Sequence, residues 1–208
     1  DLGSTQGATT TPPGTAKNVL TVGASTQGSG SGQSQSSPWS NNSGGTLDGR
    51  IKPDLVAPGG EICSARAQEA TAVPGSSCSD ALHGDSTTPL YFSDSGSSMA
   101  TGVATGAALL VRQHLREDFG ISEPDASLVK AILINGASDL GQPDIPNSNE
   151  GWGQIDLMRT LNPISDDGTA LNTLMDYGHE LRPGEALVQL VEIQQGPLDI
   201  TLSWTDPE

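Results

Sequence analysis

Ser95-Gly-Ser-Ser-Met-Ala-Thr101 is the stretch that decides the fold, because it opens the clearest helix of the chain. We expect this helix from about Ser98 to Arg116. Residues at helical spacing define its predicted buried face: Val103, Ala107, Leu110, Val111 and His114. Its first half, Met99 to Ala108, consists almost entirely of small residues, so neighbouring backbones can approach it closely. The sequence therefore predicts a central helix.

Ser98 lies in the first turn of this predicted helix. Backbone N–H groups and the helix dipole at that end favour a developing negative charge, as acyl transfer requires. A serine at a helix start is also a common N-cap, which needs no chemistry. On this segment alone, the catalytic and the capping interpretations both stay open.

Four further elements are indicated by the pattern of apolar residues and by the Pro, Gly and capping residues that bound it. Asn18 to Ala24 is a β-branched run that predicts a buried strand, and Arg50 to Gly59 predicts a short extended segment between prolines. A second helix is expected from the capping-box pattern at Ser122 to the Asn135-Gly136 stop, and a short third one from Ile155 to Leu161. Together these elements predict an α/β fold.

After Pro163 the pattern changes to that of β-structure. Leu187 to Ile193 is an apolar-rich run, Gln194 to Pro197 is a turn, and Leu198 to Trp204 alternates strictly. This pattern predicts a β-hairpin, and because a lone hairpin is marginal in water, we expect it to belong to a larger sheet.

Composition and charge exclude several classes of partner. The chain has 208 residues, 9 Lys+Arg against 25 Asp+Glu, and a formal net charge of −16. Nucleic acid and anionic membranes repel such a surface. No apolar run approaches the roughly 20 residues needed to span a bilayer. We therefore expect neither a nucleic acid nor a membrane as partner.

The two cysteines, Cys63 and Cys78, are separated by 14 residues in a stretch rich in Gly, Ser and Pro. This spacing suits one loop-closing disulfide in an oxidising compartment, although two unrelated thiols are the alternative. Another long polar stretch, Gln27 to Gly45, contains Trp39, which indicates a loop pinned to the surface of the domain.

Four segments, in this order along the chain, resemble the subtilisin-like serine proteases (subtilases, peptidase family S8). Pro13-Gly-Thr-Ala-Lys-Asn-Val-Leu-Thr-Val-Gly23 is similar to the strand beside that family's specificity pocket, and Arg50 to Gly59 is similar to its Gly-Arg-Ile-Lys-Pro-Asp-Leu-Ala-Pro-Gly segment. Ser95 to Gly106 resembles the nucleophile segment, and Gly151-Trp-Gly-Gln-Ile-Asp156 resembles the end of the catalytic domain. As a set these motifs are highly specific.

The resemblance implies that Ser98 is the nucleophile of a serine endopeptidase and that its own N–H contributes to the oxyanion hole. It also implies that Thr11, Pro12 and Pro13 lie near the pocket for the substrate residue before the scissile bond. Two positions depart from the family pattern. Ser97 replaces the usual Thr, and Gly102 replaces a proline at a cost of about 1 kcal/mol of helix stability.

The family's catalytic Asp, catalytic His and oxyanion-hole Asn lie upstream of the strand that matches residues 18–24, and none has a counterpart in this chain. We therefore expect residues 1–163 to be the C-terminal portion of a subtilase catalytic domain, and residues 164–208 to begin a β-sandwich appendage. The expected partners are a peptide or protein substrate and the N-terminal portion of the same protease. No cofactor is needed for the chemistry, but the resemblance implies structural Ca²⁺, with no ligands we can name, and a secreted or extracellular enzyme.

Two alternatives stay open. One is a non-catalytic binding module that keeps the protease scaffold. The other is an α/β-hydrolase-type esterase, because Ser98, Asp139 and His179 follow the chain order of that triad. The remaining histidines, His83 and His114, are expected in a surface loop and at a packing position.

Overall fold

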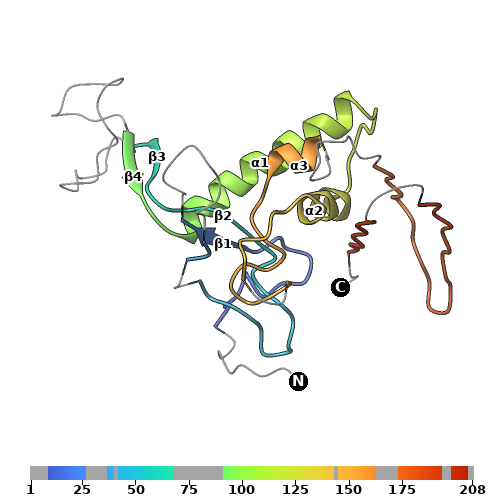
Figure 1. Ribbon diagram of the computed structural model, residues 1–208, viewed down its shortest axis with the longest axis horizontal. Helices are drawn as coiled ribbons and strands as arrows, with labels where there is room; N and C mark the ends of the chain where they lie inside the picture. The colour runs from blue at the N-terminus through green and yellow to red at the C-terminus, as the bar shows by residue number, and fades with distance from the viewer. Residues whose placement is uncertain are drawn as a thin grey trace.

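The computed structural model describes residues 9–26, 37–39, 42–67, 91–142, 145–162, 173–193 and 198–205. Four strands and three helices occur within these ranges (Figure 1). Their bounds are β1 (Val22–Ser25), β2 (Leu55–Pro58), β3 (Ile62–Ala65), β4 (Tyr91–Asp94), α1 (Ser97–Glu117), α2 (Ala126–Asn135) and α3 (Leu157–Leu161).

A small parallel sheet lies at the centre. Strands β1 and β2 pair in parallel, with Val22 opposite Leu55 and Ser25 opposite Pro58. A further segment extends the sheet beyond β2, because Val56 exchanges backbone hydrogen bonds with Gly153 and Ile155. The other edge of β1 is covered by Trp39, whose N–H donates to the Ala24 carbonyl at 2.9 Å. This parallel sheet with packed helices confirms the α/β class.

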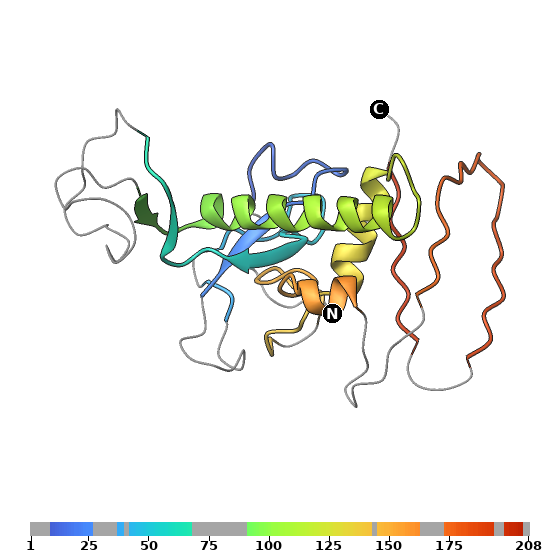
Figure 2. The ribbon, with the colours of Figure 1, turned by 90° about the horizontal axis from the view of Figure 1, so that it is seen from above.

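Helix α1 packs along this sheet (Figure 2), and the face that it buries consists mostly of small residues. Its buried residues are Ala100, Ala104, Ala107, Val111 and Leu115. The predicted buried face is therefore only partly right, since Val103 and Leu110 are 38% and 45% exposed. Alanines face the sheet because β1 and β2 approach closely there, and the bulkier side chains consequently point away from it.

Two clusters of buried side chains form the core. One joins α1 to α2 through Val111, Leu115, Val129 and Leu133, and the other joins α1 to the sheet through alanines and Trp39. The packed Trp39 confirms that the Gln27–Gly45 stretch is pinned to the domain. Residues 27–36, 40 and 41 lie outside the described residues.

Helix α2 begins later than the Ser122 pattern predicts. Its N-cap is Asp125, which has an extended backbone and no side-chain capping hydrogen bond. Pro124 disfavours a helical conformation at the residue before it, which explains why the capping box does not form. Helix α3 also begins two residues later than predicted, at Leu157, where the Asp156 side chain accepts from the N–H groups of Met158 and Arg159.

Strands β3 and β4 form an antiparallel pair that the sequence did not predict. Ile62 lies opposite Asp94 and Ala65 lies opposite Tyr91. Strand β4 is followed directly by α1, so the pair lies just before the helix that contains Ser98.

The described part of the predicted appendage, residues 173–193 and 198–205, contains no strand. Most of its apolar side chains are exposed, with Leu190 at 96% and Ile200 at 74%. The β-hairpin expected from Leu187 to Trp204 is therefore not formed among the described residues, because its apolar side chains have no sheet to pack against. The boundary at residue 163 and the β-sandwich thus stay predictions. Among the described residues, no helix has the length and apolar content needed to cross a membrane.

Candidate active site

Ser98 is the second residue of α1, and its side chain is exposed. Among the described residues its hydroxyl has no hydrogen-bond partner. The N-cap position is occupied by Gly96, which has no side chain to cap the helix. The capping interpretation of Ser98 is therefore wrong, and its hydroxyl is available for other chemistry.

The first turn of α1 also presents free backbone donors. The N–H groups of Met99 and Ala100 both donate to the Gly96 carbonyl at 3.1 Å. Within the described ranges, no acceptor bonds the N–H groups of Ser97 and Ser98. With 21 residues in the helix and no acidic residue in its first turn, these amides favour an anion beside Ser98.

The turn before Ser98 is held against the ends of β1 and β2. Gly96 N–H donates to the Gly59 carbonyl at 2.7 Å, and Gly59 N–H donates to the Ser25 carbonyl at 3.0 Å. A Cβ on Gly59 would lie 2.7 Å from both the Ala24 Cβ and the Gly96 carbonyl oxygen. Only glycine fits at this position, so the sheet fixes where α1 begins.

Neither described histidine is placed to act on Ser98. His114 follows Ser98 by 16 positions on α1, which puts it about 24 Å away along the helix axis. Its Nδ1 lies 2.6 Å from Asp118 Oδ2, and its ring meets Phe119 edge-on. His179 belongs to residues 173–193, a segment that lies beyond the C-terminal end of α1 (Figures 1 and 2). His83 lies outside the described residues.

The esterase triad is not assembled. His179 Nε2 lies 2.5 Å from Asp176 Oδ1 and not beside Asp139, whose carboxylate accepts from the nearby Gly141 N–H. The hydrogen bond from His179, helped by one from Gln189, holds the pKa of Asp176 below its usual value. A triad of Ser98, Asp139 and His179 therefore has no support in the geometry.

The predicted substrate residues Thr11, Pro12 and Pro13 form an exposed turn. Gly14 N–H donates to the Thr11 carbonyl, and the Thr21 hydroxyl donates to the Gly14 carbonyl at 2.6 Å. This turn is thus attached just before the start of β1, whereas the turn before Ser98 is attached at the end of β1. That Thr11, Pro12 and Pro13 bind substrate stays a prediction.

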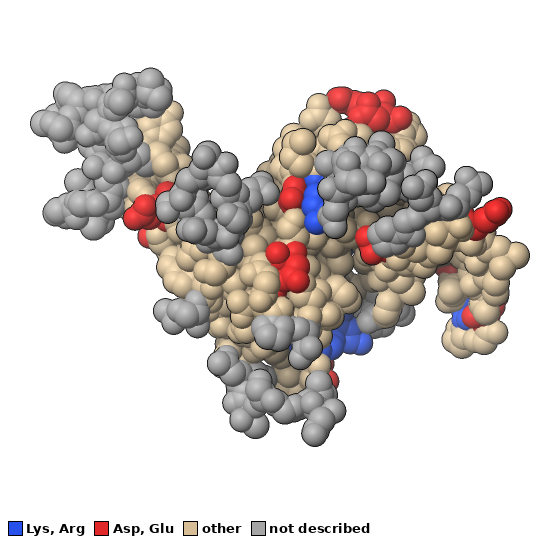
Figure 3. All heavy atoms as spheres, viewed as in Figure 1, with Lys and Arg blue, Asp and Glu red and all other residues tan. Residues whose placement is uncertain are grey.

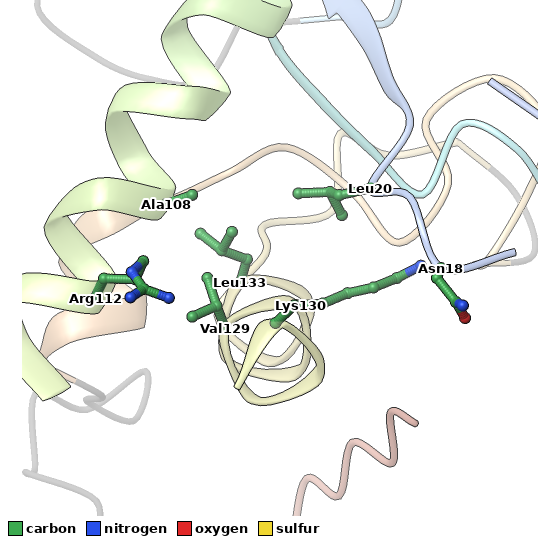
Figure 4. A pocket seen from close by; sticks show the side chains of 8 residues that line it. Asn18, Leu20, Ala108, Arg112, Val129, Lys130 and Leu133 are labelled. Atoms are coloured by element: carbon green, nitrogen blue, oxygen red, sulfur yellow. The ribbon is translucent and has the colours of Figure 1, made fainter. Parts of the chain in front are cut away.

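A cavity of about 230 Å³ lies between α1, α2 and the segment before β1 (Figure 4). Leu20, Val129 and Leu133 supply apolar walls, and Arg112 and Lys130 flank them. Ala108, the lining residue of α1 nearest to Ser98, follows it by 10 positions, about 15 Å along the helix axis. This cavity is therefore too far from Ser98 to hold the reacting peptide bond.

A buried ion cluster, which the sequence did not single out, holds the segment that enters β2. Lys52 Nζ lies 2.7 Å from Asp54 Oδ2, and Lys130 Nζ lies 2.9 Å from Asp54 Oδ1. Asp54 also accepts from the Thr21 N–H, and Lys52 donates to the Val19 carbonyl. Burial lowers the pKa of Lys52, while Asp54 opposes this shift. The cluster joins β2 both to the chain before β1 and to α2.

The disulfide and the structural calcium both stay predictions. Cys63 lies on β3, but Cys78 lies outside the described residues. For calcium, the described ranges contain no group of three or more His, Cys, Asp or Glu side chains that could hold a metal ion. These residues thus offer no calcium site of that kind.

Comparison with known proteins identifies the family. The sequence model of the subtilase family, Peptidase_S8, matches residues 2–153. The chain is 35% identical over 181 residues to the serine protease/ABC transporter B family protein tagA of Dictyostelium discoideum, covering 79% of this chain and 10% of that protein. It is 33% identical over 136 residues to the serine protease AprX of Bacillus subtilis, covering 65% of this chain and 28% of that protein.

A solved structure shows the same fold. The CspB protease of Clostridium perfringens matches with a TM-score of 0.54 and 24% sequence identity, over 74% of this chain and 28% of that one. The chain therefore spans a small share of the length of these relatives. The family match, the shared fold and the helix that opens at Ser98 agree, and the chain belongs to the subtilase family.

Proposed function

We propose that this chain forms part of a serine endopeptidase domain in which Ser98 is the nucleophile. The observation that carries the proposal is the exposed, unpartnered Ser98 hydroxyl beside free amides at the start of α1, among the described residues and inside the region that matches the subtilase family. The substrate is a peptide or protein. The relatives named above are serine proteases, which supports the class of reaction.

In the proposed mechanism, Ser98 Oγ attacks the carbonyl carbon of a peptide bond while a histidine takes its proton. The negative oxygen of the intermediate is bound by the Ser98 N–H and by an asparagine side chain. When the C–N bond breaks, the histidine gives the proton to the leaving amine, and water then hydrolyses the acyl-enzyme on Ser98. An N-terminal portion of the same protease supplies the histidine, its orienting aspartate and the asparagine.

The free face of α1 supports a need for such a portion. No charged residue occurs from Ser97 to Val111, so this part of α1 lacks the charged outer face that is common on surface helices. Yet Leu109 is 62% exposed, and a Cβ on Gly102 or Gly106 would meet nothing within 4 Å. Further polypeptide that covers this face would bury these groups and could carry the missing catalytic side chains to Ser98.

The experiment compares this chain alone with the chain joined to its N-terminal portion. Both are treated with a serine-directed fluorophosphonate and with a peptide substrate. We expect labelling and cleavage only in the joined protein, and we expect both to vanish in Ser98→Ala. Ser122→Ala, which removes an exposed hydroxyl before α2, is the matched control and should keep activity.

Other results would contradict the proposal. Cleavage by the Ser98→Ala protein would remove Ser98 as nucleophile. A joined protein that folds but neither labels nor cleaves would favour the non-catalytic binding module. Secretion, the Cys63–Cys78 disulfide and structural Ca²⁺ remain parts of the proposal that rest on cysteine spacing and on the family resemblance.

A further inference from the structure

Ser95 lies between β4 and α1, three residues before Ser98, and its side chain takes part in a defined contact. The Ser95 hydroxyl oxygen accepts the backbone N–H of Glu61 at 2.8 Å. The next residue, Gly96, donates its N–H to the Gly59 carbonyl at 2.7 Å. Both residues are thus hydrogen-bonded to the turn between β2 and β3. Ser95 uses its side chain, and Gly96 uses its backbone.

The partner on the β2–β3 turn has an unusual backbone. Glu61 has φ of 50°, in the left-handed region that residues with a Cβ seldom adopt. Its N–H is directed to a serine 34 positions later in the chain. The Ser95 N–H in turn donates to Asp94 Oδ1 at 2.7 Å, which fixes the chain as it leaves β4. The hydroxyl of Ser95 therefore joins the end of β4 to the turn that follows β2.

We propose that Ser95 is a positioning residue for Ser98, and this inference rests on the proposed protease function. Its hydroxyl holds Gly96 against Gly59, and so sets where the first turn of α1 places the Ser98 Oγ. Attack on a peptide carbonyl requires the reacting atoms to lie about 3 to 3.5 Å apart, and a displacement of about 1 Å can cost about 100-fold in rate. A side chain that never touches the substrate can therefore control the chemical step.

The test compares Ser95→Ala, Ser95→Thr and Ser93→Ala in the chain joined to its N-terminal portion. Alanine removes the acceptor for the Glu61 N–H, and threonine keeps it. Ser93→Ala is the matched control, because Ser93 lies on β4 two residues earlier and its hydroxyl has no hydrogen bond among the described residues. Rates are expressed per active site titrated with fluorophosphonate, so that any unfolded fraction does not count.

We expect Ser95→Ala to lower kcat and the fluorophosphonate labelling rate about tenfold while KM stays within about twofold. Ser95→Thr should restore kcat to within about threefold of the parent, and Ser93→Ala should change neither constant. Hydrogen exchange of the Glu61 amide should become faster in Ser95→Ala only. This last measurement reports the contact even where the variant labels poorly.

Three results would overturn the role of Ser95. These are an unchanged kcat in Ser95→Ala, a loss confined to KM, and a Ser95→Thr protein as slow as Ser95→Ala. Failure of the proposed function would appear separately, as activity that survives Ser98→Ala. A purely stabilising role would lower the melting temperature without changing the rate per titrated site.

Discussion

At the residue scale, the position of Ser98 depends on a residue far from it in sequence. Gly59 lies between the end of β1 and the start of α1, and its carbonyl accepts from Gly96. The space for a Cβ is already filled by Ala24 and by the Gly96 carbonyl oxygen. The start of α1 can therefore move as soon as this position acquires a side chain.

Gly59→Ala tests this dependence. We expect it to destabilise the protein by about 1 to 3 kcal/mol, because the added methyl group overpacks a well-packed site. Labelling of Ser98 should slow as well, since Gly96 is pushed away from Gly59. Urea unfolding in a Ser98→Ala background, which avoids self-digestion, and fluorophosphonate labelling in the active protein check the two effects. Parent-like stability and labelling together would show that Gly59 does not fix the turn.

Residue-level prediction succeeded where the signal is local. The sequence correctly placed Ser98 in the first turn of a helix, because small residues and a preceding glycine mark that turn. It did not reveal the contacts of Gly59 and Ser95, whose partners Gly96 and Glu61 are more than 30 positions away. A contact between residues far apart in the sequence produces no local sequence pattern from which it could be predicted.

At the element scale, buried ion pairs attach the segment that enters β2 to its neighbours. Asp54 is the shared partner of Lys52, whose side chain is 3% exposed, and of Lys130 on α2. Removing one partner of a buried ion pair leaves an uncompensated charge in the interior. The attachment of β2 to its neighbours therefore depends strongly on one carboxylate.

Asp54→Asn should destabilise the protein by about 3 to 5 kcal/mol near pH 7. Without Asp54, burial lowers the pKa of Lys52 further below 10.5. Between that lowered pKa and 10.5 the unfolded state binds more protons, so stability rises with pH in this window. The defect should thus be smaller at about pH 9.5 than at about pH 7, as measured by urea unfolding in the Ser98→Ala background.

The control for this variant is Glu123→Gln, which breaks an exposed ion pair with Arg112 and should change stability little at either pH. An Asp54→Asn protein as stable as the parent, or one with the same defect at both pH values, would contradict the predicted role of the cluster.

Prediction of the elements succeeded for the long helix and found the regions of β1 and β2, but it failed for β3 and β4. The bounds of α1, Ser97–Glu117, lie close to the predicted range, but its buried face was misjudged. Periodicity could not tell that alanines, and not Val103 and Leu110, face the sheet. Strands β3 and β4 were missed because each has only four residues, most of them exposed, so no apolar alternation marks them.

At the scale of the whole molecule, the net charge of −16 is the dominant property. Acidic side chains occur at several separate places on the face shown in Figure 3, where few basic ones are visible. Two of the three lysines, Lys52 and Lys130, are also bound to Asp54. The surface is therefore even more acidic than the residue count indicates, and repulsion between its carboxylates opposes the compact state.

Added salt should consequently stabilise the protein. Raising NaCl from about 0.1 M to about 1 M shortens the Debye length from about 10 Å to about 3 Å, which screens this repulsion. We expect a higher melting temperature at about pH 7 in the Ser98→Ala background. The rise should disappear near pH 4.2, the sequence pI, where little net charge remains to be screened. Equal salt responses at the two pH values would mean that charge is not the cause.

The antiparallel pairing of β3 with β4 has a consequence for how this part of the chain can vary during evolution. Since Ala65 lies opposite Tyr91 and Ile62 lies opposite Asp94, the chain returns beside the point at which it departed. Insertions or deletions between Ala65 and Tyr91 change the number of residues between β3 and β4 while the two strands stay paired. Natural selection can therefore vary the length of that stretch without moving Ser98.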